Sequence, residues 1–301
     1  MFESFYGFKE KPFSLLPDPS FLYFSKKHRL AKSMLEYGLM NQAGFTVITG
    51  EIGAGKTTLV RLMLNQVDMN DDITVGLVSN THHSFGELLQ WVLLAFDLEY
   101  RSKEKVELYH TFAEFLAREF GRGRRVVLII DEAQNLSPEA LEELRMLSNV
   151  NANKDQILQL VLVGQPGLRD MLRYPELEQF AQRIAIDYHL KTLDLQETCE
   201  YIRHRLTVAG GDPKLFESSA CVTVHYYTRG TPRLINVLCD TALVCGFAEE
   251  KPKIDADLIH DVVRDKTVGG IVPFSEDRPS SKGTDVVLDI QDAKKKINNK
   301  E

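Results

Sequence analysis

The feature that most constrains this sequence is a short glycine-rich run that ends in Lys-Thr. The run reads Gly50-Glu51-Ile52-Gly53-Ala54-Gly55-Lys56-Thr57 and fits the pattern G-x-x-x-x-G-K-[ST]. Residues 45–49 before it are apolar or β-branched and predict a buried strand, and residues 58–64 after it predict a helix. A chance glycine turn is the alternative, but it gives no reason for Lys-Thr between a strand and a helix. The sequence therefore predicts a phosphate-binding loop.

Each part of this loop has a chemical role in binding a nucleoside triphosphate. Glycines let the backbone turn its N–H groups toward phosphates, and the helix N-terminus adds a partial positive charge. We expect Lys56 to reach the β- and γ-phosphates and the Thr57 hydroxyl to ligate Mg²⁺. The residues expected to bind the nucleotide are Gly50, Glu51, Ile52, Gly53, Ala54, Gly55, Lys56, Thr57 and Thr58.

A second group of functional residues follows the apolar run at 126–130. Such a run predicts a strand buried on both faces of a parallel sheet, and Asp131 and Glu132 follow at its carboxyl end, where open α/β sheets bind ligands. Asp131 can support the Mg²⁺ shell, and Glu132 can orient and polarise the attacking water. Many strands end in Asp, so this pattern alone is only moderately specific for a nucleotide site. The phosphate-binding loop predicted upstream makes it a strong indication.

The order of strand and helix patterns predicts the fold. Further strands are expected at 73–79, 157–163 and 183–190, which gives five strands separated by helices and hence a parallel α/β sandwich. Gln165 follows the strand at 157–163, where it either contacts the γ-phosphate and the attacking water or is simply a turn residue.

The chain of 301 residues suggests about two domains. From residue 194 the periodicity is helical, so a small all-helical domain follows the sheet. We expect an aromatic and proline-rich irregular segment packed on the sheet domain (1–24), the α/β domain (25–192), the helical domain (193–266) and a flexible tail (267–301).

Composition excludes some classes of protein. A formal net charge of −7 does not suit a generally basic nucleic-acid binder, although a local basic patch remains open. The 4 cysteines show no C-x-x-C pair, which favours buried thiols and a cytoplasmic setting. We expect no transmembrane segment, because no apolar run approaches about 20 residues, and the first residues show no secretory signal.

Several motifs together resemble AAA+ ATPases, and more closely the general secretion pathway protein A family with its relatives in pilus and exopolysaccharide systems. The resemblance covers about residues 1–265, on the whole-segment comparison that motifs require. The motifs are residues 6–13 (YGFKEKPF) with Pro17-Asp18-Pro19, residues 50–58 (GEIGAGKTT), residues 130–136 (IDEAQNL), residues 162–166 (LVGQP) and residues 230–236 (GTPRLIN).

The resemblance implies ATP as the nucleotide, ATP hydrolysis, and roles for three residues outside the loop. Gln165 lies where the family has its first sensor. Arg233 matches the second sensor, which contacts the γ-phosphate from a helical lid domain. Arg183 is similar to the arginine offered to a neighbouring subunit's nucleotide, with Arg169 and Arg173 as competing candidates.

The resemblance further implies a homo-oligomer, either a ring or a filament, and a protein partner in an envelope-associated system. Recruitment to the inner face of the membrane by that partner is a further expectation. Family members often continue into a membrane helix and a peptidoglycan-binding domain. Neither is visible in these 301 residues, which favours a member without a direct cell-wall role. The alternatives are a DNA-binding ATPase of the transposition target-selector type, a non-hydrolysing scaffold and a small-molecule kinase.

Overall fold

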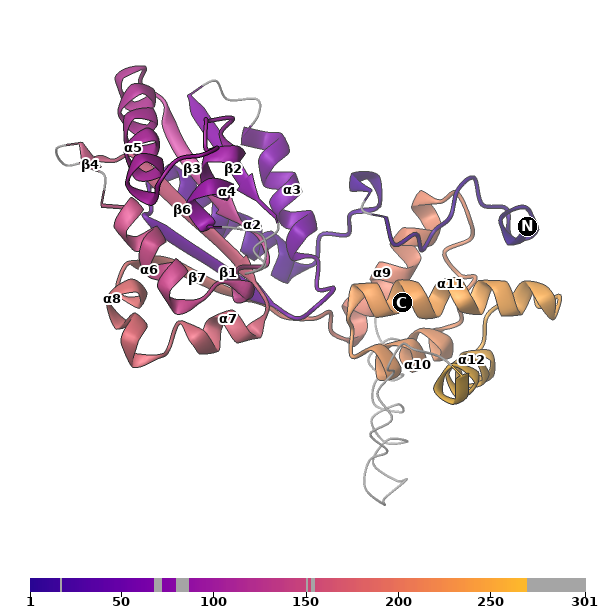
Figure 1. The fold of residues 1–301 in the computed structure, drawn as a ribbon. Helices are drawn as coiled ribbons and strands as arrows, with labels where there is room; N and C mark the ends of the chain where they lie inside the picture. The colour runs from indigo at the N-terminus through magenta and orange to yellow at the C-terminus, as the bar shows by residue number, and fades with distance from the viewer. Residues whose placement is uncertain (17, 68–71, 80–86, 150, 153–154, 270–301) are drawn as a thin grey trace. The chain divides into compact units, whose positions relative to one another are not determined.

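The computed structural model of this chain describes residues 1–269 except 17, 68–71, 80–86, 150 and 153–154 (Figure 1). The chain divides into two units. Residues 24–191 form one unit, which contains the sheet, and residues 1–23 together with residues 192–269 belong to the other, whose described part is helical. Most of the tail predicted at 267–301 lies outside the described residues.

The sheet unit alternates strands and helices. Its long strands are β1 (Phe45–Gly50), β2 (Ile73–Val78), β3 (Arg125–Ile130), β6 (Leu158–Gly164) and β7 (Ile184–Leu190). Its helices are α2 (Lys26–Met40), α3 (Lys56–Val67), α4 (Leu88–Ala95), α5 (Lys105–Gly121), α6 (Pro138–Leu147), α7 (Pro166–Met171) and α8 (Glu178–Ala181). Two short strands, β4 (Asn151–Ala152) and β5 (Asp155–Gln156), pair antiparallel, and 3₁₀ turns occupy Ala133–Asn135 and Pro175–Leu177.

The five long strands form one sheet in the order β2-β3-β6-β1-β7, and each neighbouring pair is parallel. The parallel α/β sheet predicted from the sequence is therefore confirmed. In this order β6 lies between β1 and β3, with Thr49 opposite Gly164 and Ile130 opposite Leu162. The residues that follow β1, β3 and β6 are consequently gathered at one edge of the sheet.

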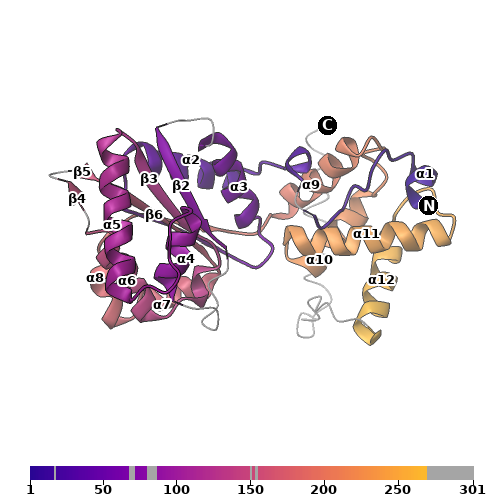
Figure 2. The ribbon, with the colours of Figure 1, turned by 45° about the horizontal axis from the view of Figure 1, so that its top comes forward.

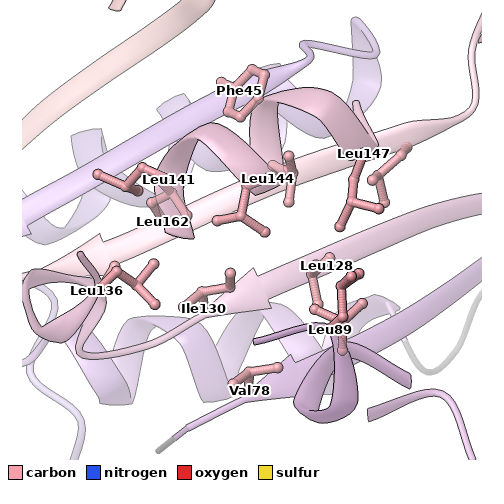
Figure 3. Packing of buried hydrophobic residues seen from close by; sticks show 14 of the residues in the cluster. Phe45, Val78, Leu89, Leu128, Ile130, Leu136, Leu141, Leu144, Leu147 and Leu162 are labelled. Carbon is pink, nitrogen blue, oxygen red and sulfur yellow. The ribbon is translucent and has the colours of Figure 1, made fainter. Parts of the chain in front are cut away.

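Helices cover both faces of the sheet (Figures 1 and 2). Alternate residues of a strand point to opposite faces, so Leu128 and Ile130 join the core beneath α4 to α8, whereas Val127 and Ile129 join the core beneath α2 and α3. In Figure 3 the leucines of α6 pack over the strands. A strand buried on both faces is mainly apolar, as β3 is from Val126 to Ile130 and β6 is apart from the buried Gln159, which is why both strands were recognisable in the sequence.

The helical unit consists of α1 (Phe2–Tyr6), a 3₁₀ turn (Pro19–Phe21), α9 (Leu195–Val208), α10 (Ser218–Thr228), α11 (Pro232–Ala248) and α12 (Ala256–Gly269). Its core is separate from the two cores of the sheet unit. Asp194 caps α9 by accepting from the Glu197 backbone N–H at 2.9 Å, and the Glu197 side chain accepts in return from Asp194 N–H. The two units meet in sequence at Lys191 and Thr192.

The N-terminal segment differs from the prediction, because it belongs to the helical unit rather than to the sheet domain. Phe2, Phe8, Phe13 and Phe21 are buried in the core formed by α9 to α12. Arg205 of α9 fixes the segment: its Nε donates to Pro12 O at 2.5 Å, and its guanidinium carbon lies 4.5 Å from the centre of the Phe21 ring. An aromatic-rich sequence predicts that the segment is buried but does not identify the partner surface.

Within the described part of the chain, no helix combines the length and the apolar character that a membrane crossing requires.

Candidate functional site

The loop at residues 50–57 connects β1 directly to α3, as the sequence predicts. Gly53 and Gly55 have φ of 76° and 99°, a region that side-chain-bearing residues rarely adopt. Lys56 and Thr57 are the first two residues of α3, so they stand at the helix N-terminus, where unpaired N–H groups favour an anion. The two glycines therefore stand where the backbone favours glycine, and the loop ends at a helix N-terminus as the sequence predicts.

Lys56 is a buried cation next to the loop. Its side chain is 7% exposed, and Nζ donates to Gly50 O at 2.7 Å and to Glu51 O at 2.9 Å. Burial lowers the pKa of Lys56, while the negative charges of Glu132, Asp131 and Glu51 act in the opposite direction. A buried ammonium whose present partners include two neutral carbonyls is suited to receive phosphate oxygens.

Thr57 and Asp131 come together across the carboxyl edge of the sheet. Thr57 Oγ1 donates to Asp131 Oδ2 at 3.0 Å, although the two residues are 74 positions apart in the chain. Burial raises the pKa of Asp131, and hydrogen bonds from the Glu132 backbone and from Thr57 counteract this. A hydroxyl and a buried carboxylate at this separation are hard oxygen ligands that fit Mg²⁺.

Glu132 is placed next to this pair by an unusual backbone conformation. Its φ and ψ are 55° and 35°, in the left-handed region, and its N–H donates to Asp131 Oδ1 at 2.9 Å. Gln134 Nε2 and Gln165 Nε2 donate to the same carboxylate oxygen, Oε2, at 2.6 and 3.1 Å. The carboxylate is therefore held from two sides.

Gln134 is the residue of this network that sequence reasoning did not assign. In addition to its bond with Glu132, its Oε1 accepts from the Gln165 backbone N–H at 2.8 Å. It thereby links Glu132, the second residue after β3, to Gln165, the first residue after β6. One indication in the sequence that Gln134 belongs to the site was its place within the run 130–136. The spacing between Gln134 and Glu132 does not by itself predict a hydrogen bond between their side chains.

The two predicted arginines have different surroundings. Arg183 precedes β7, and its Nη1 donates to Ser148 Oγ at 3.1 Å and to Asn149 Oδ1 at 2.6 Å, just beyond α6. Arg233 is in the helical unit, in the first turn of α11 after Thr231 and Pro232. The structure thus gathers Lys56, Thr57, Asp131, Glu132 and Gln165 in the sheet unit. The roles predicted for these residues, for Arg183 and for Arg233 stay predictions.

Comparison with known proteins identifies the class to which this fold and site belong. Residues 39–172 match the family model described as an AAA domain. The ORC2 protein of Aeropyrum pernix, solved in ADPNP–ADP complexes, is similar with a TM-score of 0.63 and 16% identity over 86% of this chain and 72% of that one. Cdc6p from Pyrobaculum aerophilum gives a TM-score of 0.62 at 13% identity over 83% and 71%. At this identity the likeness shows the fold, and the chain has the AAA+ fold that the sequence predicted.

A curated relative defines the resemblance more narrowly. The chain is 40% identical over 255 residues to the general secretion pathway protein A of Aeromonas hydrophila. The match covers 84% of this chain but only 46% of that protein, so the chain spans about half the length of this relative. The chain is thus an AAA+ protein related to general secretion pathway protein A, and the resemblance inferred from its motifs is confirmed.

Proposed function

We propose that this chain is a Mg²⁺-dependent ATPase. The observation that carries the proposal is the meeting of Thr57 and Asp131 at 3.0 Å next to Lys56, with Glu132 held by two glutamine side chains. A phosphate loop, a pair of hard metal ligands and an oriented carboxylate are the parts that phosphoryl transfer to water requires.

Each residue has a distinct role in this proposal. The N–H groups of the loop and Lys56 bind the phosphates. Thr57 and Asp131 would hold Mg²⁺, which supplies positive charge against the phosphate oxygens. Glu132 accepts the proton of the attacking water, and Gln165 senses the γ-phosphate next to it.

The Thr57 hydroxyl provides a specific test. A Thr57→Val variant keeps the shape of the side chain but removes the metal ligand, whereas Thr57→Ser keeps the hydroxyl. Phosphate release from ATP measured against Mg²⁺ concentration should be nearly abolished in Thr57→Val and close to wild type in Thr57→Ser. Unchanged, Mg²⁺-dependent phosphate release by Thr57→Val would contradict the assigned site.

We further propose that the ATPase works as a switch in an assembled form. Arg233 would couple the γ-phosphate to the helical unit, and an arginine such as Arg183 would act on the nucleotide of a neighbouring subunit. Loss of the γ-phosphate would then alter subunit contacts, as in other nucleotide switches. The proposed setting is cytoplasmic.

The similarity to general secretion pathway protein A supports a role in export of proteins or polymers through the cell envelope. The test is to replace the chromosomal gene in the host with the Lys56→Ala or the Glu132→Gln allele and to measure the exported material. Both alleles should abolish export while the protein remains present at wild-type level. Normal export with both alleles would refute this role and leave the ATPase proposal intact.

A further inference from the structure

A buried histidine contacts the back of the loop at residues 50–57. His28 is 6% exposed and lies in the first turn of α2, three residues after the helix cap Ser25. Its Nε2 is 3.0 Å from Ala54 O, and its Nδ1 is 2.8 Å from Ser25 Oγ. All these residues belong to the sheet unit, so the contact does not depend on the helical unit.

The hydrogen-bond pattern defines the protonation of the ring. A backbone carbonyl can only accept, so Nε2 of His28 must carry a proton and donate it to Ala54 O. In the neutral ring Nδ1 then accepts from the Ser25 hydroxyl, whose oxygen in turn accepts from the His28 backbone N–H at 3.3 Å. Ser25, which is 1% exposed, thus caps α2 and selects the tautomer of His28.

This contact has a direct consequence for the phosphate loop. The peptide bond between Ala54 and Gly55 is planar and trans, so its C=O and N–H point in opposite directions. With the carbonyl held by His28, the Gly55 N–H must point away from the ring. Among the described residues, none accepts a hydrogen bond from that N–H. A peptide flip would instead aim a carbonyl oxygen at the bound phosphates, which repels them.

Gly55 and His28 also fit each other sterically. A Cβ placed on Gly55 would lie 2.9 Å from His28 Nε2, and Gly55 already has a φ of 99°. The ring therefore fills the space that the missing side chain leaves behind the loop. Glycine alone would allow the Ala54–Gly55 peptide to rotate, and the His28 imidazole restricts that rotation.

We propose that His28 is a positioning residue for nucleotide binding: it fixes the Ala54–Gly55 peptide so that the Gly55 N–H faces the phosphates. This inference rests on the proposed function, because it assigns to His28 a supporting role at the same nucleotide site. His28 itself does not touch the nucleotide.

The test compares three substitutions in the full chain by calorimetric titration with MgADP. His28→Ala removes the donor. His28→Gln places an amide nitrogen about where Nε2 lies, whereas His28→Asn places it about where Nδ1 lies. We expect the Kd for MgADP to rise about tenfold in His28→Ala and His28→Asn, the loss expected for one hydrogen bond, and to stay within about threefold of wild type in His28→Gln. In ATP hydrolysis the loss should appear in KM more than in kcat.

A control separates this role from a loss of stability. Thr74→Val removes a hydrogen bond of 2.8 Å to the buried Glu119 elsewhere in the sheet unit. It should lower the melting temperature but leave the Kd for MgADP unchanged. If His28→Ala does not fold, the comparison of Gln with Asn decides alone.

Two negative results have different meanings. If folded wild-type protein does not bind MgADP, the proposed function fails. If the wild type binds MgADP and all three His28 variants bind it equally well, or Asn binds as tightly as Gln, only the positioning role is overturned.

Discussion

At the residue scale, Glu132 depends on its neighbours for its position. A non-glycine residue with φ of 55° costs about 1–3 kcal/mol of strain, and such strain persists only where surrounding contacts impose it. Here the contacts are the bonds from Gln134 and Gln165 to Oε2 and the bond from the Glu132 N–H to Asp131. The conformation therefore directs the carboxylate toward one place at the edge of the sheet.

Replacing Gln134 by Glu tests this account. The change keeps an acceptor for the Gln165 N–H but replaces the amide that donates to Glu132 Oε2 with a second negative charge. Repulsion between the two carboxylates should move Glu132 out of the position that its hydrogen bonds impose. We expect kcat for ATP hydrolysis to fall by about 10² or more.

The neutral substitution Gln134→Leu is the control for this prediction. It removes both hydrogen bonds without adding charge, so kcat should fall less than in Gln134→Glu. An equal or larger loss of kcat in Gln134→Leu would show that the lost hydrogen bonds, and not the added charge, displace Glu132.

At the scale of elements, the N-terminal segment is a structural part of the helical unit. Phe13 is 1% exposed and packs against Phe216, with ring centroids 5.8 Å apart. The Phe13→Ala change should destabilise this unit by about 3–5 kcal/mol, seen as a lower melting temperature in denaturation followed by circular dichroism. Phe5→Ala is the matched control because Phe5, in the same segment, is 44% exposed. Similar effects of both changes would contradict the assigned packing.

The turn before α11 is a second element that depends on one residue. Gly230 has a φ of 70°, its carbonyl accepts from Leu193 N–H at 2.9 Å, and an added Cβ would meet Leu193 O at 1.8 Å. Gly230→Ala must therefore displace the segment that leads from β7 into α9. We expect a loss of about 2 kcal/mol or more in the free energy of unfolding and lower ATPase activity, because Arg233 follows this turn.

Gly121→Ala provides the comparison for that change. Nothing lies within 4 Å of a Cβ at Gly121, the last residue of α5, so alanine should be neutral or slightly stabilising there. Comparable destabilisation by both substitutions would indicate that the contact with Leu193 is unimportant.

The sequence predicts these elements to very different extents. Strands such as β3 and β6 are recognisable because burial on both faces favours a mainly apolar run, and the loop at 50–57 because its chemistry requires fixed spacing. The order of strands in the sheet and the position of residues 1–23 depend on long-range packing, which local pattern does not encode. His28 and Gln134 were missed for the same reason: their partners Ala54 and Gln165 are 26 and 31 positions away.

At the scale of the whole molecule, an arginine supplied by a neighbouring subunit should make activity depend on assembly. Such arginines contribute about 10³–10⁵ in rate in related phosphoryl-transfer systems. ATP turnover per subunit should therefore rise steeply with protein concentration. A high turnover that is constant on dilution would contradict assembly-dependent catalysis.

Mixing two inactive variants identifies the arginine. Arg183→Ala keeps its own phosphate loop, and Lys56→Ala keeps its arginine, so the mixture should recover activity that neither variant has alone. Recovery with Arg169→Ala or Arg173→Ala in place of Arg183→Ala would assign the role to that residue. If the mixture with Arg183→Ala stays inactive, Arg183 does not act between subunits.

The central claim is that one triphosphate is bound by the loop after β1 and cleaved with the help of Glu132. The most direct measurement is a single-turnover experiment with protein in excess over labelled ATP and Mg²⁺, in which bound and hydrolysed nucleotide are counted separately. Wild type should bind ATP and convert it to ADP, Lys56→Ala should not retain it, and Glu132→Gln should retain it with cleavage slowed by about 10² or more. Cleavage at the wild-type rate by Glu132→Gln, or equally tight ATP binding by Lys56→Ala, would contradict the account.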